Sequence, residues 1–349
     1  MATVRTKRVS IKDIAERAGV SISLVSFVLN GKSREHRVGE EIAERITRIA
    51  EEMRYVPNMV AKGLRSGRTY TIGFIIPDLE APYFAKLSGI IEREASVRGY
   101  SIMMGSTGES DTRASGVIEL LRSRGVDGII AAPNQGSRDE IERVASEGMP
   151  VIMVDRHYSG SDIATVTLDN RKAAYDATCG LIERGYRNIK AVTYRSGLEH
   201  IGDRVEGYLA AIAENGLIPE VFNADYYNRR EGIERWIASV MSGPDKPDAL
   251  LFMADILCVD GIIELTKAGY AIPEDVAVIS FDKNDAFDLC SVPISYIEQP
   301  HDRFAEAAVG MLLKAVTEGE ELSADKSVTV THRICWRGST PVHRIEKQP

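Results

Sequence analysis

The sequence predicts a small all-α head near the N-terminus and a larger α/β body after it. Within the first 56 residues, two short helical segments joined by a tight glycine turn precede a third helical segment. From Thr69 onward, short apolar runs alternate with amphipathic helical segments, which is typical of a parallel α/β sheet. The 349 residues also exceed the length of one ordinary core, so more than one folding unit is expected.

The first two helices of the head have recognisable ends. Ser10 stands where the first residue of a capping box would, so a helix is expected over Ile11–Ala18. Gly19 ends this helix, and Ser21 then caps a second helix over Ile22–Leu29. The asparagine and glycine that follow end the second helix.

A third helix is predicted over residues 40–54. Ile42, Ile46, Ile49 and Met53 recur there at helical spacing, so they can face the first two helices. Three helices with a tight turn between the first two predict a helix-turn-helix domain over residues 1–56. Such a small unit buries little surface, and we expect it to be only marginally stable alone.

Residues 57–68 are predicted to be a hinge. Pro57 ends the third helix or begins a new segment. The stretch PNMVAKGLRS (57–66) is short, contains Gly63 and lacks a broad apolar face. By itself it is not expected to be stably helical in water.

The body, residues 69–340, is predicted to contain about seven strand–helix units. The apolar runs that predict strands are 71–76, 100–105, 128–132, 150–155, 189–194, 249–253 and 276–281. The predicted helices between them are 84–98, 111–124, 137–148, 171–185, 203–215, 231–240 and 258–268. One parallel sheet could hold these strands, but two sheets fit the length better. Residues 341–349 are a tail.

A dinucleotide-binding dehydrogenase is the alternative topology. That fold needs a glycine-rich turn directly after a strand. The run 71–76 is followed instead by Pro-Asp-Leu-Glu, without any glycine. Dinucleotide binding is therefore disfavoured.

Charge and composition limit the possible functions further. The first 68 residues carry 14 lysines and arginines against 8 acids, although the whole chain has a net charge of −8. A basic head on an acidic body suggests that the head meets a polyanion. No apolar run is long enough to span a bilayer, and no secretory signal follows the N-terminal basic residues.

The four cysteines do not form a C-x-x-C pair, so free thiols are expected rather than disulfides or a metal site. No cofactor is predicted. The sequence also lacks a nucleophile elbow, a P-loop and an H-E-x-x-H motif, which argues against an enzyme.

Three segments taken together resemble the LacI/GalR family of transcriptional regulators. They are SIKDIAERAGVSISLVSFVLNG (10–31), YVPNMVAKGLRSGRTYTIGFIIPD (55–78) and VAVISFDK (276–283). The resemblance covers nearly the whole chain. It implies a type I periplasmic-binding-protein-like body of two parallel-sheet subdomains joined by three crossovers. The first would hold about 69–169 and 299–328, and the second about 170–298 and 329–340.

The resemblance implies that the second helix enters the major groove of operator DNA, with its N-terminal residues near base edges. Ser23 can hydrogen-bond a base, whereas Ile22 and Phe27 can make only apolar contacts, or Phe27 can pack in the core. Many family members have threonine at the place of Leu24 and arginine at the place of Phe27, so a guanine contact from position 27 is excluded. The remaining DNA-contact candidates, which would contact phosphates, are Ser21 at the helix start, Asn30, Lys32 and Arg34.

The hinge has its own implied role in this family. Two hinge helices pair across a dimer in the minor groove, and a leucine from each is wedged into a base step. Leu64 matches that residue, with Asn58 and Ala61 on the same short helix. The alternative for Leu64 is a linker residue that packs on the body.

The resemblance places an effector cavity between the subdomains, at the carboxyl ends of strands. Aromatic faces suit the C–H surfaces of a sugar, and acidic, amide and guanidinium groups suit its hydroxyls. The matching candidates are Tyr83, Phe84, Asp155, His200, Arg204, Tyr227, Ala254, Asp282 and Gln299. Asp282 and Arg204 are the strongest, because each is expected just after a strand or at the start of a helix. Tyr83 and Phe84 could equally be core residues, and His200 could be ordinary surface.

Two departures from the family pattern complicate a simple sugar site. Ala254 stands where many members have an effector-binding asparagine, and Lys283 stands where many have a second aspartate. Lys283 could favour an acidic or phosphorylated effector, or it could pair with Asp285 or Asp282. A saccharide or a derivative remains the favoured effector.

The expected function is therefore a cytoplasmic repressor, nucleoid-associated when bound, that binds double-stranded DNA under the control of a small molecule. The last residues, 337–349, lack a leucine heptad, so a homodimer is expected rather than a coiled-coil tetramer. The alternatives are a soluble sugar-binding protein without DNA function, and a variant that activates transcription or needs its ligand to bind DNA.

Overall fold

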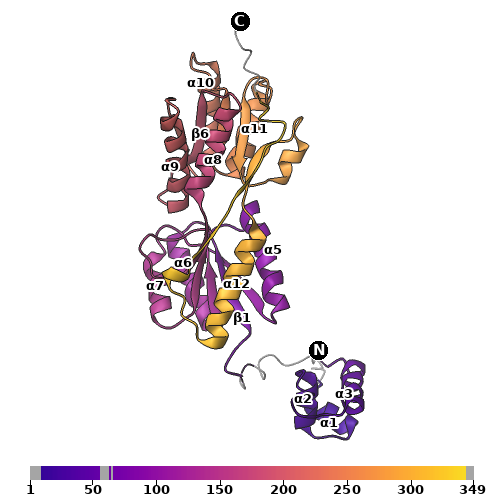
Figure 1. Ribbon diagram of the computed structural model, residues 1–349. Helices are drawn as coiled ribbons and strands as arrows, with labels where there is room; N and C mark the ends of the chain where they lie inside the picture. The colour runs from indigo at the N-terminus through magenta and orange to yellow at the C-terminus, as the bar shows by residue number, and fades with distance from the viewer. Residues whose placement is uncertain (1–8, 56–62, 64–65, 343–349) are drawn as a thin grey trace, which may run out of the picture. The chain divides into compact units, whose positions relative to one another are not determined.

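The computed structural model describes residues 9–55, 63 and 66–342. It divides the chain into two compact units, Met1–Thr69 and Tyr70–Pro349, which are described separately. The first unit is the all-α head, and the second contains two α/β subdomains (Figure 1).

The head contains the three predicted helices, α1 (Ile11–Ala18), α2 (Ile22–Leu29) and α3 (Glu40–Glu52). The predicted capping box is present, because the Ser10 side chain accepts from the Asp13 amide while the Asp13 carboxylate accepts from the Ser10 amide. Gly19 ends α1 in the left-handed region at φ 66°. The Ser21 hydroxyl caps α2 by accepting from the amide of Leu24.

The core of the head fixes which side of α2 faces outward. Ile14, Val25 and Ile46, one from each helix, are fully buried against one another. Ile22 and Ser23, in the first turn of α2, are both exposed. The second helix therefore has one face in the core and one face free for a partner.

Most of the predicted hinge lies outside the described residues, including Asn58, Ala61 and Leu64. Within the described part, the amide of Gly67 donates to the carbonyl of Gly63 at 2.8 Å. This bond has the i→i−4 spacing of an α-helical turn.

The first subdomain of the body is a six-stranded sheet with helices on both faces. Its strands are β1 (Thr71–Ile76), β2 (Ser101–Ser106), β3 (Gly128–Ala131), β4 (Val151–Val154), β5 (Thr165–Leu168) and β11 (Val328–Val330). Helices α5 (Pro82–Val97) and α12 (His301–Glu318) pack together on one face, and α6 (Asp111–Ser123) and α7 (Arg138–Ser146) pack on the other. All strand pairs are parallel, and the central strands are buried on both faces.

The second subdomain repeats this plan. Its strands are β6 (Ile189–Tyr194), β7 (Val221–Ala224), β8 (Ala249–Phe252), β9 (Ala277–Phe281), β10 (Ser295–Glu298) and β12 (Arg333–Cys335). Its helices are α8 (Asn170–Glu183), α9 (Glu199–Glu214), α10 (Arg229–Ser242) and α11 (Asp255–Lys267), with a short 3-10 helix at Asp285–Leu289. Only β12 runs antiparallel to its neighbour, so this sheet is mixed at one edge.

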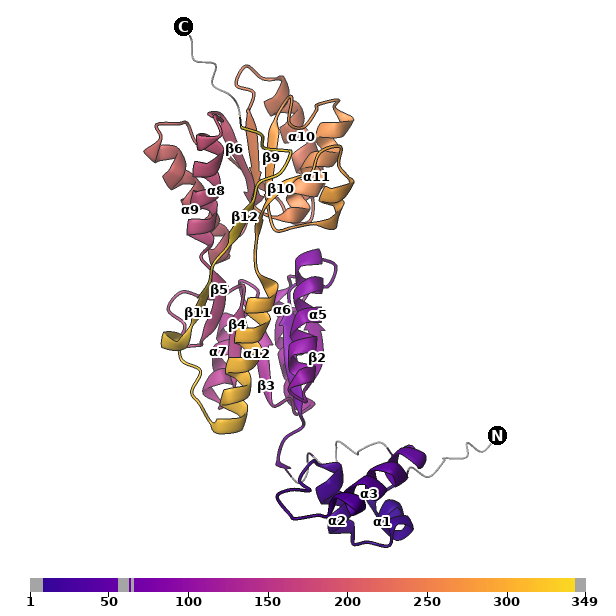
Figure 2. The ribbon, with the colours of Figure 1, turned by 45° about the vertical axis from the view of Figure 1, so that its right-hand side comes forward.

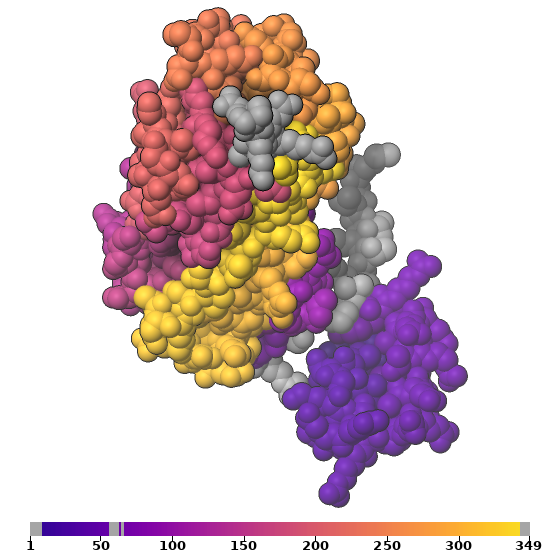
Figure 3. Space-filling view, turned by 45° about the horizontal axis from the view of Figure 1, so that its top comes forward, coloured from indigo at the N-terminus to yellow at the C-terminus, as the bar shows by residue number. Residues whose placement is uncertain are grey.

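The two sheets have the same strand order. It is β11-β5-β4-β3-β1-β2 in the first and β12-β10-β9-β8-β6-β7 in the second. The chain passes between them three times: from β5 to α8, from β10 to α12, and from β11 to β12 (Figure 2). In Figure 3 the late, yellow part of the chain runs over the surface of both subdomains.

Five strands and one long helix were not among the sequence predictions. The strands β5, β7, β10, β11 and β12 have three or four residues each and all include a polar residue, so none of them forms an apolar run. The helix α12 packs on β3, β4 and β5 although it follows the second subdomain in the chain. None of the helices described is long and apolar enough to cross a membrane.

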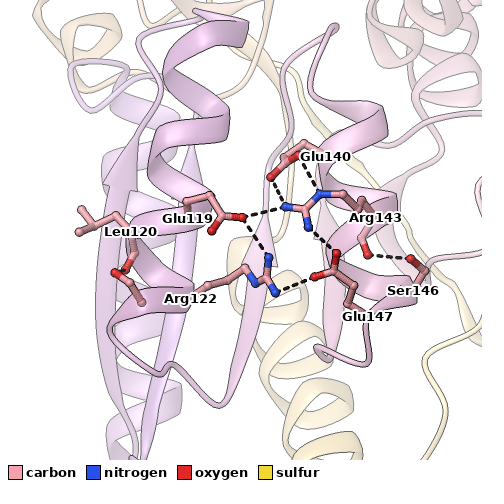
Figure 4. Close-up of polar contacts among 8 residues, drawn as sticks. Glu119, Leu120, Arg122, Glu140, Arg143, Ser146 and Glu147 are labelled. Carbon is pink, nitrogen blue, oxygen red and sulfur yellow. Dashed lines mark hydrogen bonds and ion pairs between the residues drawn. The ribbon is translucent and has the colours of Figure 1, made fainter.

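The outer helices of the first subdomain are joined by an exposed ion-pair network (Figure 4). The guanidinium of Arg143 on α7 bonds Glu119, Glu140 and Glu147, and Arg122 on α6 bonds Glu119 and Glu147. The network therefore links α6 to α7 on the exposed side of these helices.

Candidate effector cavity and DNA-facing helix

A cavity of about 260 Å³ lies at the carboxyl ends of the strands, between the two subdomains. All nine residues predicted for an effector site line it. The complete lining is Asp78, Ala81, Tyr83, Phe84, Glu109, Asp155, Arg156, Tyr194, Arg195, Ser196, Leu198, His200, Ile201, Arg204, Tyr226, Tyr227, Ala254, Asp255, Ile256, Asp282 and Gln299. Ligand sites of α/β folds occur at this edge of the sheet.

Two aspartates enter the cavity directly from strand ends. Asp155 follows β4 and Asp282 follows β9, and both have a left-handed backbone, at φ 66° and 63°. Aspartate tolerates this region better than most residues, because its short polar side chain can bond locally. The turn that results ends each strand and leaves the carboxylate at the edge of the sheet.

Arg204 is a buried cation of the cavity that is held by two hydrogen bonds and a ring contact. Its Nε donates to Asn170 Oδ1 at 2.8 Å, and its Nη1 donates to the carbonyl of Met253 at 2.6 Å. Its guanidinium carbon lies 4.1 Å from the centroid of the Phe281 ring. The helix α9 begins at Glu199, earlier than the predicted 203–215, so Arg204 lies in its second turn rather than at its start.

Burial controls the protonation of the cavity. Desolvation, with Asp255 and Asp155 nearby, raises the pKa of Asp282 to about 7 despite the opposing effect of Arg204. Desolvation also raises the pKa of Asp155 and of Asp255. The pKa of His200 is well below its ordinary value, because the ring is buried and lies near Arg204, so this histidine is neutral.

Several buried polar atoms in the lining lack a hydrogen-bond partner. They include Asp282 Oδ1, Gln299 Oε1 and His200 Nδ1. An unpaired buried acceptor is costly, and a bound ligand that donates hydrogen bonds would satisfy it.

The aromatic candidates have different positions. Tyr83 Oη donates to Asp155 Oδ1 at 2.8 Å, while Phe84 is almost completely buried in the core and also lines the cavity. Tyr227 is 74% exposed and stands edge-on to Tyr226. Phe84 is therefore both a core residue and a cavity residue. His200 is buried and is not an ordinary surface residue.

Several lining residues were not predicted from the sequence. Arg156 donates to both carboxylate oxygens of Glu109, at 2.7 and 3.1 Å, in a nearly buried pair. Tyr226 Oη donates to Asp78 Oδ2 at 2.8 Å and stacks obliquely on Tyr194. Arg156 could have been predicted from its place directly after Asp155. The partners could not, because Glu109 lies 47 positions from Arg156 and Asp78 lies 148 positions from Tyr226.

Some contacts join the two subdomains beside the cavity. Glu199, at the start of α9, accepts from the amide and the hydroxyl of Ser159 and lies 3.0 Å from His157 Nε2. The amide of Gly197 donates to Gln135 Oε1 at 3.2 Å. Together with the bond from Tyr226 to Asp78, these contacts hold the subdomains together around the cavity.

The expectations for Lys283 were wrong. It pairs with Asp288, at 3.5 Å, rather than with Asp282 or Asp285, and it does not line the cavity. Ala254 lines the cavity and precedes α11, and the buried carboxylate beside it, Asp255, accepts from Asn284 Nδ2 at 2.8 Å.

In the head, the predicted DNA-contact residues of α2 lie on or beside its outward face. Phe27 is half-buried and is not part of the core cluster, and its ring stacks on His36 with centroids 3.6 Å apart. The Asn30 side chain donates to the Ser26 carbonyl at 2.7 Å. Lys32 and Arg34 follow on an exposed loop. Ser21, Ile22 and Ser23 are all exposed at the start of the helix.

Across the described residues, no cluster of histidine, cysteine and acidic side chains could hold a metal ion. The four cysteines are free; Cys258 is buried and the others are half-buried.

A helix-turn-helix head followed by a two-subdomain body with a central cavity defines a DNA-binding transcriptional regulator that binds a small-molecule effector. Residues 10–58 match the bacterial regulatory proteins of the lacI family. Residues 69–335 match the periplasmic binding proteins and sugar binding domain of the LacI family. The chain belongs to the LacI family.

Relatives of known name agree with this family. The chain is 29% identical over 337 residues to catabolite control protein A of Priestia megaterium, covering 95% of this chain and 99% of the relative. It is 30% identical over 305 residues to the sucrose operon repressor of Klebsiella pneumoniae, covering 86% and 90%. It is 28% identical over 319 residues to the PurR repressor of Erwinia tasmaniensis, covering 90% and 92%.

Solved structures show the same fold. The Lac repressor dimer bound to operator and an anti-inducer superposes with a TM-score of 0.81 at 19% identity, covering 96% of this chain and all of the other. A LacI family regulator from Enterococcus faecium with bound ribose superposes with a TM-score of 0.70 at 23% identity, covering 78% and all of the other.

Proposed function

We propose that this protein is a transcriptional repressor whose affinity for operator DNA is set by a neutral saccharide or saccharide derivative. The observation that carries the proposal is the cavity, in which the buried acceptors Asp282 Oδ1 and Gln299 Oε1 have no partner. Sugar hydroxyls are donors that satisfy such acceptors, and the tyrosines of the lining suit the apolar faces of a sugar ring. The sucrose operon repressor is a relative whose name already indicates sugar metabolism.

The charges of the lining favour a neutral ligand over an acidic one. Five carboxylates surround the cavity, from Asp78, Glu109, Asp155, Asp255 and Asp282, against the guanidinium groups of Arg156, Arg195 and Arg204. Glu109 already binds Arg156 with both oxygens, and the backbone and Asn170 hold Arg204. Lys283, which could have favoured an anionic effector, is paired elsewhere.

The protein would act as a homodimer on a near-palindromic operator in the cytoplasm, where it meets the chromosome. Two-fold symmetry of the heads dictates two-fold symmetry of the site, with half-sites about one helical turn apart. Asn58, Ala61 and Leu64 would contact the minor groove between the half-sites, as the family resemblance implies. The head would use Ser21, Ile22, Ser23, Phe27, Asn30, Lys32 and Arg34 in each half-site. No catalytic role is proposed for the acids of the cavity.

Selection of DNA from a random library, with and without a panel of carbohydrates, tests this function. We expect a motif with dyad symmetry whose enrichment changes with one class of carbohydrate. Affinity for the selected site should fall with salt at a slope of roughly −5 to −9 in log K against log salt. A flat salt dependence or a motif without a dyad would contradict DNA binding by a symmetric dimer.

Calorimetry tests the effector site separately. Asp282→Ala should weaken binding of the selected carbohydrate by on the order of 1–3 kcal/mol, because ligand donors lose their acceptor. Operator affinity without ligand should stay the same. Unchanged carbohydrate affinity in a folded variant would remove Asp282 from the site.

A further inference from the structure

The recognition helix α2 offers little polar chemistry for reading bases. Its outward face presents Ile22, Ser23 and Phe27, and the Ser26 hydroxyl accepts from Asn30 Nδ2 at 3.3 Å. An isoleucine and a phenylalanine can contact only apolar base atoms such as thymine methyls. Of these three residues only Ser23 can hydrogen-bond a base, so a second hydrogen bond to a purine needs a donor from outside this face of the helix.

The loop between α2 and α3 is folded tightly back on α2. The amide of Lys32 donates to the Phe27 carbonyl at 2.8 Å, and the amide of His36 donates to the Lys32 carbonyl at 3.1 Å. The amide of Val38 donates to the Ser33 carbonyl at 2.8 Å. These bonds fix the loop and place His36 against the second turn of the recognition helix.

The rings of Phe27 and His36 form a parallel stack. Their centroids are 3.6 Å apart, and their planes differ by 13°. Adjacent bases on one DNA strand are spaced by about 3.4 Å. Two rings at this separation can therefore present their edges to two successive bases.

The imidazole of His36 is free to donate. The residue is exposed, and within the described part of the chain no hydrogen bond to either ring nitrogen is found. A neutral imidazole has one N–H donor and one acceptor nitrogen, and both are donors when the ring is protonated. Purine N7 and guanine O6 are the acceptors that the major groove presents to such a donor.

We propose that Phe27 and His36 read two adjacent base pairs as one unit, with Phe27 on a thymine methyl and an N–H of His36 on a purine acceptor. His36 is then a specificity-determining residue contributed by the loop, and the stack holds its ring at the spacing of the bases. Lys32, Arg34 and Arg37 on the same loop supply the charge that brings it to the DNA.

The test is DNA selection with the full chain and two variants of His36. His36→Phe keeps an aromatic ring for the stack but removes both nitrogens, and His36→Gln keeps a donor but loses the ring. With His36→Phe we expect the purine preference at one position of each half-site to disappear. Affinity for the parent operator should fall by about 5- to 10-fold per half-site, as for one lost hydrogen bond. His36→Gln should retain part of the preference.

A matched control removes a charge elsewhere in the head. Arg45→Gln, on the exposed side of α3, can weaken binding to every sequence but should leave the motif intact. If His36→Phe selects the same motif as the parent, the proposal is wrong. A uniform loss of affinity with an unchanged motif would also overturn it, because it would mean that His36 contacts a phosphate. If the parent chain itself selects no motif, the proposed sequence-specific DNA binding is wrong, and not only the role of His36.

Discussion

Asp155 and Asp282 occupy the same position in the two subdomains and line the same cavity. β4 and β9 hold equivalent places in the two sheets, and each aspartate follows its strand with a left-handed backbone. The amide of Asp155 donates to the Val166 carbonyl and that of Asp282 to the Ile297 carbonyl, both at 2.9 Å. The repeated fold therefore brings one carboxylate from each subdomain to the lining of one cavity.

The first prediction concerns stability and pH. The Asp282 carboxyl has a pKa of about 7 in the native protein against its ordinary value of 3.8, so the native state keeps a proton that the unfolded chain releases. The contribution of this group to stability therefore falls as pH rises from about 4 to about 7. Asp282→Asn should be more stable than the parent at pH 8, with an upper limit of about 4 kcal/mol, and similar to it near pH 4. Urea unfolding at both pH values measures the difference; an equal difference at both would contradict the raised pKa.

The second prediction concerns ligand binding and pH. An ionised Asp282 accepts hydrogen bonds from ligand hydroxyls through Oδ1, whereas the protonated form is a weaker acceptor. Carbohydrate affinity should therefore increase between pH 6 and pH 8, through the pKa of about 7. Asp282→Asn should bind more weakly, and its affinity should not rise over this interval. Titration calorimetry at several pH values is the measurement. If the parent binds the carbohydrate equally well at every pH in this interval, binding does not depend on the ionised form of Asp282.

The third prediction concerns the contacts by which Glu199 joins the two subdomains beside the cavity. Glu199→Ala removes the acceptor for Ser159 and the partner of His157, so the subdomains should separate more readily. We expect association and dissociation of the carbohydrate each to become roughly fivefold faster, because the closed arrangement of the subdomains loses about 1 kcal/mol of stability. Glu206→Ala, on the same helix, is the control, because Glu206 is exposed and pairs only loosely with Arg171, at 3.9 Å. Stopped-flow rates equal in both variants would show that Glu199 does not restrain the subdomains.

The fourth prediction concerns the network around Arg143. Arg143→Ala should lower the thermal midpoint, because α7 loses its ties to Glu119 and Glu147. The pKa of Glu119 is lowered by its bonds to Arg143 and Arg122, so this stabilisation is present above the ordinary pKa of 4.5 and is lost as pH falls below it. The difference in midpoint should also shrink at about 1 M salt, which screens exposed pairs. Scanning calorimetry measures it, with Arg138→Ala as a control, since Arg138 forms its ion pair with Glu142 within α7 and also lies over the Tyr158 ring, 5.8 Å from its centroid. A loss that is equal at every pH and salt concentration would mean that packing, rather than charge, is responsible.

The sequence determined much of this protein because many of its signals are local. The caps at Ser10 and Ser21 and the turn at Gly19 set the ends of α1 and the start of α2, where the structure has them. The long apolar runs became β1, β4, β6 and β9 within a residue or so, because a strand buried on both faces must be apolar throughout. The polar residues that end β4 and β9 lie in two separate sheets, and it was the family resemblance that assigned them to one cavity between the subdomains.

The tertiary structure decided the features that depend on residues far apart in the chain. Edge strands such as β7 and β12 are short and contain polar residues, so they form no apolar run, and they exist because a neighbouring strand pairs with them. The bond between Tyr226 and Asp78 and the pairing of Lys283 with Asp288 arise from packing that no local pattern records. The raised pKa of Asp282 is of the same kind, since it results from desolvation and from two other carboxylates that the fold gathers around it.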